Sequence, residues 1–133
     1  MLVTIEKVLL LKQMEPFKTV SNMALSDLMA MAEEQTLKED TILINEKEPN
    51  KKIYFLLSGA VEVKKNNNTE EVSAKAVLGL CSAFWIGNAD EQVKTIQKSV
   101  LLSLTQDKLY RIMALHPSLA FAVLNELSAC AHS

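Results

Sequence analysis

Apolar residues at helical spacing mark the beginning of the chain. They repeat at this spacing from Ile5 to Leu9 until a proline stops the pattern, which predicts a short leading helix. Ser21 or Asn22 then caps a second segment, and one face of that segment is apolar. This face consists of Leu25, Leu28, Met29 and Ala32. We therefore expect leading helices within residues 1–34.

Between residues 35 and 104 the apolar residues no longer follow helical spacing. Short apolar runs such as "TILIN" and "IYFLLSGAVEV" alternate with the stretches "EKEPNKK" and "KKNNNTEE", which is typical of strands joined by turns. The run "IYFLL" predicts a strand buried on both faces, whereas Val61 and Val63 alternate with residues that can face water. Ser58-Gly59 predicts a tight bend between these two strands, and "SVLLSL" predicts a last strand ending at Leu104.

Helical spacing returns after the last strand. Leu109, Ile112 and Met113 predict one helix, and His116-Pro117 divides it from another because proline disfavours a helical residue before it but suits the first turn of a new helix. The final apolar stripe is expected at Ala120, Val123, Leu124 and Leu127. Helices at both ends, many short strands and no alternation of strand with helix predict an α+β fold, an antiparallel sandwich or roll with helices packed at one end.

Length and composition restrict the function. The 133 residues suffice for a single domain with one core. The 14 basic and 16 acidic side chains are interspersed, so neither nucleic acid nor a membrane surface is an expected direct partner. The apolar run "VLLL" is too short for a signal peptide or a membrane span, which favours a cytoplasmic protein.

Candidate chemistry is sparse. Cys81 and Cys130 match no metal-ligand spacing, and we interpret them as small buried thiols in a reducing compartment. The spacing of Ser82, His116 and the acidic residues shows no nucleophile with a base and an orienting group. We therefore expect no catalytic residue, no metal site and no enzyme activity.

The order of these patterns resembles the cyclic nucleotide-binding domain family. The resemblance is carried by "LSDLMAMAEEQTLKEDTILINEKEPNKKIYFLLSGAVEV" and "SVLLSLTQDKLYRIMALHPSLAFAVLNEL". In the first stretch the matching residues are Tyr54, Ser58, Gly59, Val61 and Val63. The resemblance implies one domain over residues 1–133, a β-roll of jelly-roll type (a double-stranded β-helix) over 35–104, and hinge and lid helices over 105–130. It also implies a regulatory module of a larger protein.

The stretch "GLCSAFWIGNADEQV" stands where the family has its phosphate-binding cassette. The resemblance implies backbone N–H groups for the cyclic phosphate, a Glu for the ribose hydroxyl and an Arg for the phosphate charge. Aligned from Gly79, Leu80 stands at the Glu position and Ala89 at the Arg position; aligned on Gly87, Asp90 stands at the Arg position. The candidate pocket residues are Gly79, Leu80, Cys81, Ser82, Ala89 and Asp90.

These departures predict weak or absent binding of cAMP and cGMP, and no cofactor. Without an arginine paired to the phosphate, the binding free energy is weaker by roughly 1.5–3 kcal/mol. A ribose hydroxyl buried against Leu80 costs about 1–3 kcal/mol more. Arg111, the only arginine, lies beyond the cassette, and we expect it on the surface. Phe84, Trp85 and Ile86 are expected to fill the emptied pocket, with Trp85 in the core; the alternative is an aromatic floor for another ligand.

In two turns where the family has glycine, the chain places Asp40, which tolerates a left-handed conformation, and Lys47, which does so at a cost.

Three functions remain open at this level. The first is a regulatory domain whose nucleotide site has decayed, acting on other domains of a parent protein or on a protein partner. The second is a ligand-free interaction or dimerisation module that uses the last helix, which allows a homodimer. The third is a β-roll retuned to a different small ligand. An open, polar space behind Gly79 favours a ligand-responsive domain, whereas a space filled by Phe84 or Trp85 favours the interaction module.

Overall fold

The structure is a computed structural model and describes residues 3–130. The remaining residues of the expected domain, 1–2 and 131–133, lie outside this range. Two helices and one short turn of 3-10 helix open the chain: α1 (Thr4–Leu11), η1 (Phe17–Thr19) and α2 (Asn22–Met31). The predicted cap of α2 is confirmed at Ser21, whose hydroxyl accepts a hydrogen bond from the N–H of Ala24 at 3.2 Å.

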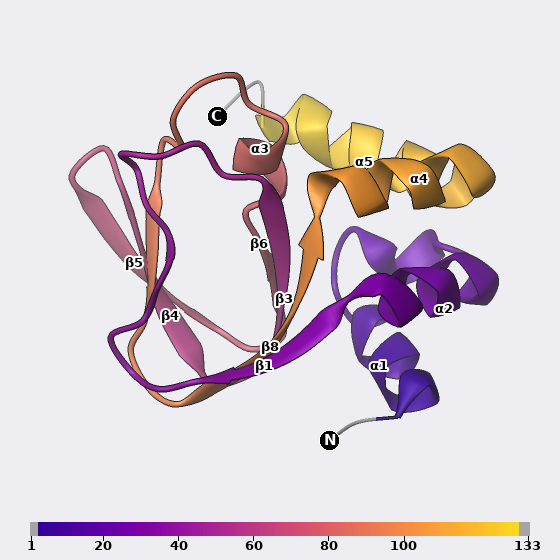
Figure 1. The fold of residues 1–133 in the computed structure, drawn as a ribbon, viewed down its shortest axis with the longest axis horizontal. Helices are drawn as coiled ribbons and strands as arrows, with labels where there is room; N and C mark the ends of the chain where they lie inside the picture. The colour runs from indigo at the N-terminus through magenta and orange to yellow at the C-terminus, as the bar shows by residue number, and fades with distance from the viewer. Residues whose placement is uncertain (1–2, 131–133) are drawn as a thin grey trace.

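The strands form two antiparallel four-stranded sheets, in the orders β1-β8-β3-β6 and β2-β7-β4-β5. Figure 1 shows the first sheet between the helices and the second sheet. This arrangement confirms the predicted α+β fold with an antiparallel β-roll. Within the described range the strands are β1 (Glu33–Leu37), β2 (Ile42–Ile44), β3 (Lys52–Ser58), β4 (Ala60–Lys65), β5 (Asn68–Ser73), β6 (Ala76–Leu78), β7 (Gln92–Thr95) and β8 (Ser99–Thr105).

β3 separates two hydrophobic clusters, which explains its continuous apolar sequence. Ile53, Phe55 and Leu57 pack into the cluster shared with the helices. Tyr54 and Leu56 point to the other face and pack into the cluster between the two sheets. Successive side chains of a strand alternate between faces, so a strand between two cores must be apolar at every position. The expected burial of "IYFLL" on both faces is confirmed.

The hairpin of β4 and β5 is longer than the sequence indicated. Of the expected turn "KKNNNTEE", only Asn66 and Asn67 form the turn, and they have φ of 51° and 67°. Strand β5 begins at Asn68, opposite Lys65, and its side chains are almost all exposed. A strand with both faces largely in water has no apolar alternation, so the hydrophobic pattern could not reveal it.

The two turns that depart from the family pattern differ from each other. Asp40 has φ of 63°, as expected for a residue that tolerates the left-handed region, and its N–H donates to the carbonyl of Thr95 at 2.8 Å. Lys47 does not have positive φ, so the expected strain there is wrong. Its N–H instead donates to the side-chain oxygen of Asn45 at 3.0 Å, which closes the turn without a left-handed residue.

Two helices close the described chain, α4 (Gln106–Leu115) and α5 (Pro117–Cys130). The predicted break is confirmed, because His116 has extended backbone angles between them. Nε2 of His116 also lies 2.6 Å from Oδ2 of Asp27, which ties the break to α2. The predicted stripe on α5 is wrong in part: Leu124 is exposed, and the buried residues are Leu119, Ala122 and Val123.

Candidate functional site

The cassette begins with a left-handed glycine followed by one turn of helix. Gly79 has φ of 80° and caps α3 (Leu80–Ala83), directly after β6. A Cβ built on Gly79 would lie 2.8 Å from Cδ1 of Ile44 and 3.0 Å from the carbonyl oxygen of Lys52. Both the backbone angle and the lack of space therefore require glycine at this position.

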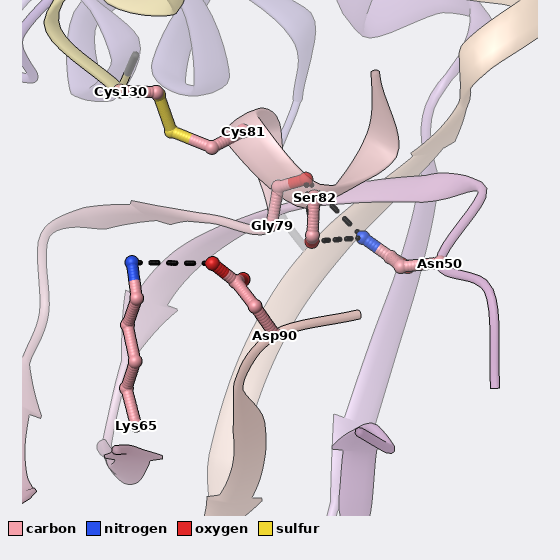
Figure 2. Close-up of a disulfide and its surroundings, with 7 residues drawn as sticks. All are labelled: Asn50, Lys65, Gly79, Cys81, Ser82, Asp90 and Cys130. Atoms are coloured by element: carbon pink, nitrogen blue, oxygen red, sulfur yellow. Dashed lines mark hydrogen bonds and ion pairs between the residues drawn. A yellow bond between two sulfur atoms is a disulfide. The ribbon is translucent and has the colours of Figure 1, made fainter. Parts of the chain in front are cut away.

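Asn50 holds the cassette helix against the roll. Its side-chain Nδ2 lies within hydrogen-bond distance of three oxygens, the Lys52 carbonyl at 2.8 Å, Oγ of Ser82 at 2.9 Å and the Gly79 carbonyl at 3.2 Å. Figure 2 shows this amide directed at the start of α3. Asn50 is buried, so its hydrogen bonds are shielded from water. Sequence reasoning missed this residue because an Asn after a proline is an ordinary turn signal.

A cavity of about 600 Å³ lies beside α3. Its walls come from the residues before η1, strands β4, β5 and β6, the segment from Gly79 to Glu91, and the C-terminal half of α5. Five of the six candidate residues line it: Gly79, Leu80, Cys81, Ser82 and Asp90. Segments distant in sequence therefore meet around one open space.

Ala89, the sixth candidate, is placed elsewhere. It is buried in the cluster between the two sheets, and its N–H donates to the carbonyl of Glu48 at 2.9 Å. Asp90, the next residue, lines the cavity. Of the two alignments considered, the one that sets Asp90 at the family's Arg position is therefore the one that puts a side chain at the cavity wall.

The charges around the cavity are mainly negative. Among its described lining residues, one cation, Lys65, stands against carboxylates from five positions: Glu15, Glu70, Asp90, Glu91 and Glu126. Nζ of Lys65 lies 3.3 Å from Oδ2 of Asp90, so part of its charge is already neutralised (Figure 2). Burial, and then the neighbouring Asp90, raise the pKa of Glu91, although Lys65 opposes the shift. The cavity therefore offers a poor environment for an anion.

The expected filling of the pocket by Trp85 is wrong. Trp85 is 61% exposed and Ile86 is 95% exposed. Phe84 is half-buried and packs against Tyr110 of α4 in an edge-on geometry, with ring centroids 5.2 Å apart. Phe84 and Trp85 both border the cavity, so they form part of its wall without filling it, and the alternative interpretation of an aromatic floor for another ligand stays a prediction.

The two cysteines are also not the buried thiols that the sequence suggested. Cys81 and Cys130 form a disulfide with Cα atoms 6.0 Å apart, and Figure 2 shows it joining α3 to the last turn of α5. Cys81 is exposed and Cys130 is half-buried. A separation of 49 residues carries no local signal, so only the fold could bring the two thiols together.

The other candidate cations lie away from the cavity. Arg111 is exposed on α4, as expected. Lys94 of β7 has its Nζ 3.8 Å from Oδ1 of Asp40 and is not among the described residues that line the cavity. Residues 3–130 contain no cluster of His, Cys, Asp or Glu suited to a metal ion. In the same range, no helix is both long and apolar enough to cross a bilayer.

Residues 34–116 match the family described as the cyclic nucleotide-binding domain, and the chain belongs to this family. The match ends at the helix break, so α5 lies beyond it. No match to a curated protein was found at the sequence level. The assignment therefore rests on the family match together with the fold.

Several solved structures share the fold. The sensor domain of the transcriptional regulator DNR from Pseudomonas aeruginosa is 22% identical with a TM-score of 0.77, covering 95% of this chain and 94% of that one. The N-terminal domain of a transcriptional regulator from Streptomyces coelicolor is 21% identical, with a TM-score of 0.77 and 92% coverage of both chains. The regulatory domain of Toxoplasma gondii PKA, solved with cAMP, is 19% identical with a TM-score of 0.70, covering 82% of this chain and 44% of that one. At these identities the likeness shows the fold alone.

Proposed function

We propose that this chain is a regulatory sensor domain whose cavity does not bind cAMP or cGMP with the affinity usual for the family. The observation that carries the proposal is the charge of the cavity, where one lysine faces carboxylates at five positions. A cyclic phosphate brought there would meet Asp90 and Glu91 rather than a free cation. Like charges at close range oppose binding, and neither residue can replace an arginine fork.

The apolar side of the site points to the same conclusion. Leu80 is 6% exposed and packs into the core shared with the helices. A ribose hydroxyl placed against it would lose its hydrogen bonds to water and gain no acceptor. With the missing phosphate pair, the loss amounts to about 10²–10⁴ in affinity. A variant of the same proposal is that the open cavity binds a small ligand whose chemistry differs from that of a cyclic nucleotide.

Calorimetric titration of the whole chain with cAMP and with cGMP tests the proposal. We expect no saturable heat below millimolar concentration. Asp90→Arg supplies the missing cation at an exposed position of the cavity wall and should recover measurable affinity. Ala89→Arg is the matched control, because it buries the same cation between the sheets and should destabilise the fold without any gain in binding. Micromolar binding by the unmodified protein would overturn the proposal and assign the phosphate to the amides at the start of α3.

The domain is proposed to act as a module of a larger protein or on a protein partner, without catalysis of its own. The similar structures described as a sensor domain and an N-terminal domain of transcriptional regulators support this role. Gln106, at the start of α4, provides a physical link between site and output. Its side-chain amide donates to the carbonyl of Ala83, so a shift of α3 would act directly on the hinge helix.

A dimerisation module is the second candidate, and exposed apolar side chains on α5 favour it. Phe121 is 69% exposed and Leu124 is 56% exposed, three residues apart on one side of the helix. If this face pairs two copies, sedimentation should show a dimer that Phe121→Ser with Leu124→Ser converts to a monomer. Ile86→Ser, at an exposed apolar residue of the cassette, should leave the dimer intact. A wild-type protein that stays monomeric at all accessible concentrations would exclude this role.

A further inference from the structure

The disulfide joins α3, which follows the β-roll strand β6, to the last turn of α5. Cys81 lies in the single turn of α3 that follows β6, and Cys130 is the last residue of α5. Their Cα separation of 6.0 Å lies within the range of ordinary disulfides. Figure 2 shows the bridge above the pair formed by Lys65 and Asp90. The bond therefore spans from the cassette to the end of the C-terminal helix.

The two halves of α5 are held in different ways. Leu119, Ala122 and Val123, in the first half, are buried at 0%, 5% and 0% exposure. After Val123 no described residue of the helix is buried, and Leu127 is only half-buried against the core. Few buried apolar contacts mean low local stability. The last two turns of α5 therefore depend on the disulfide for their position.

The same part of α5 forms a wall of the cavity. Glu126, Leu127 and Cys130 line it from the helix, opposite lining residues of β4 and β5 such as Val63 and Val72. A displacement of these turns would remove that wall and change both the volume and the charge of the cavity. The bond that fixes the turns therefore also fixes the shape of the site.

We propose that Cys81 and Cys130 form a redox latch: the disulfide clamps the end of α5 over the cavity, and reduction releases it. The reductant is a low-molecular-weight thiol such as glutathione. Its thiolate attacks one cysteine sulfur and forms a mixed disulfide, while the other cysteine leaves as a thiolate and takes up the proton. A second thiol attacks the mixed disulfide, so the products are two cysteine thiols and one molecule of oxidised glutathione.

The bond is accessible to such a thiol. Cys81 is exposed, and both cysteines border the open cavity. Exposed disulfides are the ones that exchange readily and serve regulation, whereas deeply buried ones resist reduction. The latch depends only on where the bond lies and not on the identity of a ligand, so it stands or falls independently of the nucleotide titration.

Hydrogen exchange read by mass spectrometry tests the latch on the whole chain in the oxidised and the reduced state. Reduction should speed exchange of the amides of residues 124–130 by about tenfold or more, because the disulfide no longer restricts the local opening of these turns. Amides of β3 and of the first half of α5 should keep their protection. Cys81→Ser and Cys130→Ser, made separately, should reproduce the reduced pattern in the absence of any reductant.

Two further measurements separate a switch from a structural crosslink. In glutathione buffers of graded ratio, the bond should open and close reversibly, and both released thiols should react with iodoacetamide while the fold persists. A bond that stays closed in millimolar reduced glutathione would overturn the proposal. So would unchanged exchange of residues 124–130 on reduction, or loss of β3 protection at the same time, which would mark global unfolding instead of a local release.

Discussion

The two halves of the cassette segment, Gly79–Ala83 and 84–91, differ in how the fold holds them. The first half is fixed: Gly79 fits where no Cβ could, Asn50 bonds to the helix turn, and Leu80 and Ala83 are buried in the core. In the second half Trp85 and Ile86 are exposed, and a Cβ on Gly87 would meet nothing within 4 Å. The contrast teaches that one segment beside a cavity can combine a turn fixed by buried contacts with a turn whose side chains stand largely in water.

Replacing the glycines tests this contrast with the largest expected effect. Gly79→Ala should lower the free energy of unfolding by about 2 kcal/mol or more, because a left-handed backbone and a close approach to the Lys52 carbonyl act together. Gly87→Ala is the matched control, since Gly87 has φ of 102° but open space around it. It should cost only about 1 kcal/mol. Urea denaturation of both variants measures the difference; equal costs would mean that the two halves are held alike.

Removing the Asn50 amide should have the next largest effect. Asn50→Ala leaves the buried hydroxyl of Ser82 and the carbonyl of Gly79 without this donor, which should cost about 1–3 kcal/mol. Asn45→Ala is the control, because Asn45 accepts a single exposed bond from Lys47. Denaturation together with hydrogen exchange at α3 provides the measurement. If Asn45→Ala were as costly as Asn50→Ala, Asn50 would have no special role in the cassette.

The smallest effect is expected at Glu91, which borders the cavity at the end of the second half. Burial raises the pKa of Glu91 above its ordinary value of 4.5, with Asp90 adding to the shift and Lys65 opposing it. The folded state therefore binds this proton more tightly than the unfolded state, so stability falls as pH rises from the ordinary value through the raised pKa.

Glu91→Gln removes the cost of holding a charged carboxylate at this buried position beside Asp90. The variant should melt at a higher temperature than the wild type at about pH 7, and this advantage should shrink below about pH 4. Glu70→Gln, at an exposed position of the same cavity, should change the melting temperature little at either pH. An advantage for Glu91→Gln that does not depend on pH would show that packing, not ionisation, is responsible.

The order of the elements and the family were predictable from the sequence because their signals are local. The cap at Ser21, the break at His116 and the doubly buried strand β3 each depend on residues within a few positions of one another. Hydrophobic period and turn chemistry report such features directly. The segment that borders the cavity, including Gly79 and Asp90, was identified from the resemblance to the family and not from a local signal.

The contents of the site were decided by the tertiary structure. Glu15 comes from the turn between α1 and η1, Glu70 from β5 and Glu126 from α5, and only the folded chain brings them around one cavity. The bond between Cys81 and Cys130, the placement of Asn50 beneath α3 and the exposure of Trp85 likewise have no signature in the neighbouring residues. The sequence by itself determined the framework, since periodic burial is a local property of the chain. The charge, the opening and the covalent clamp of the site depend on contacts between distant segments, which exist only once the chain has folded.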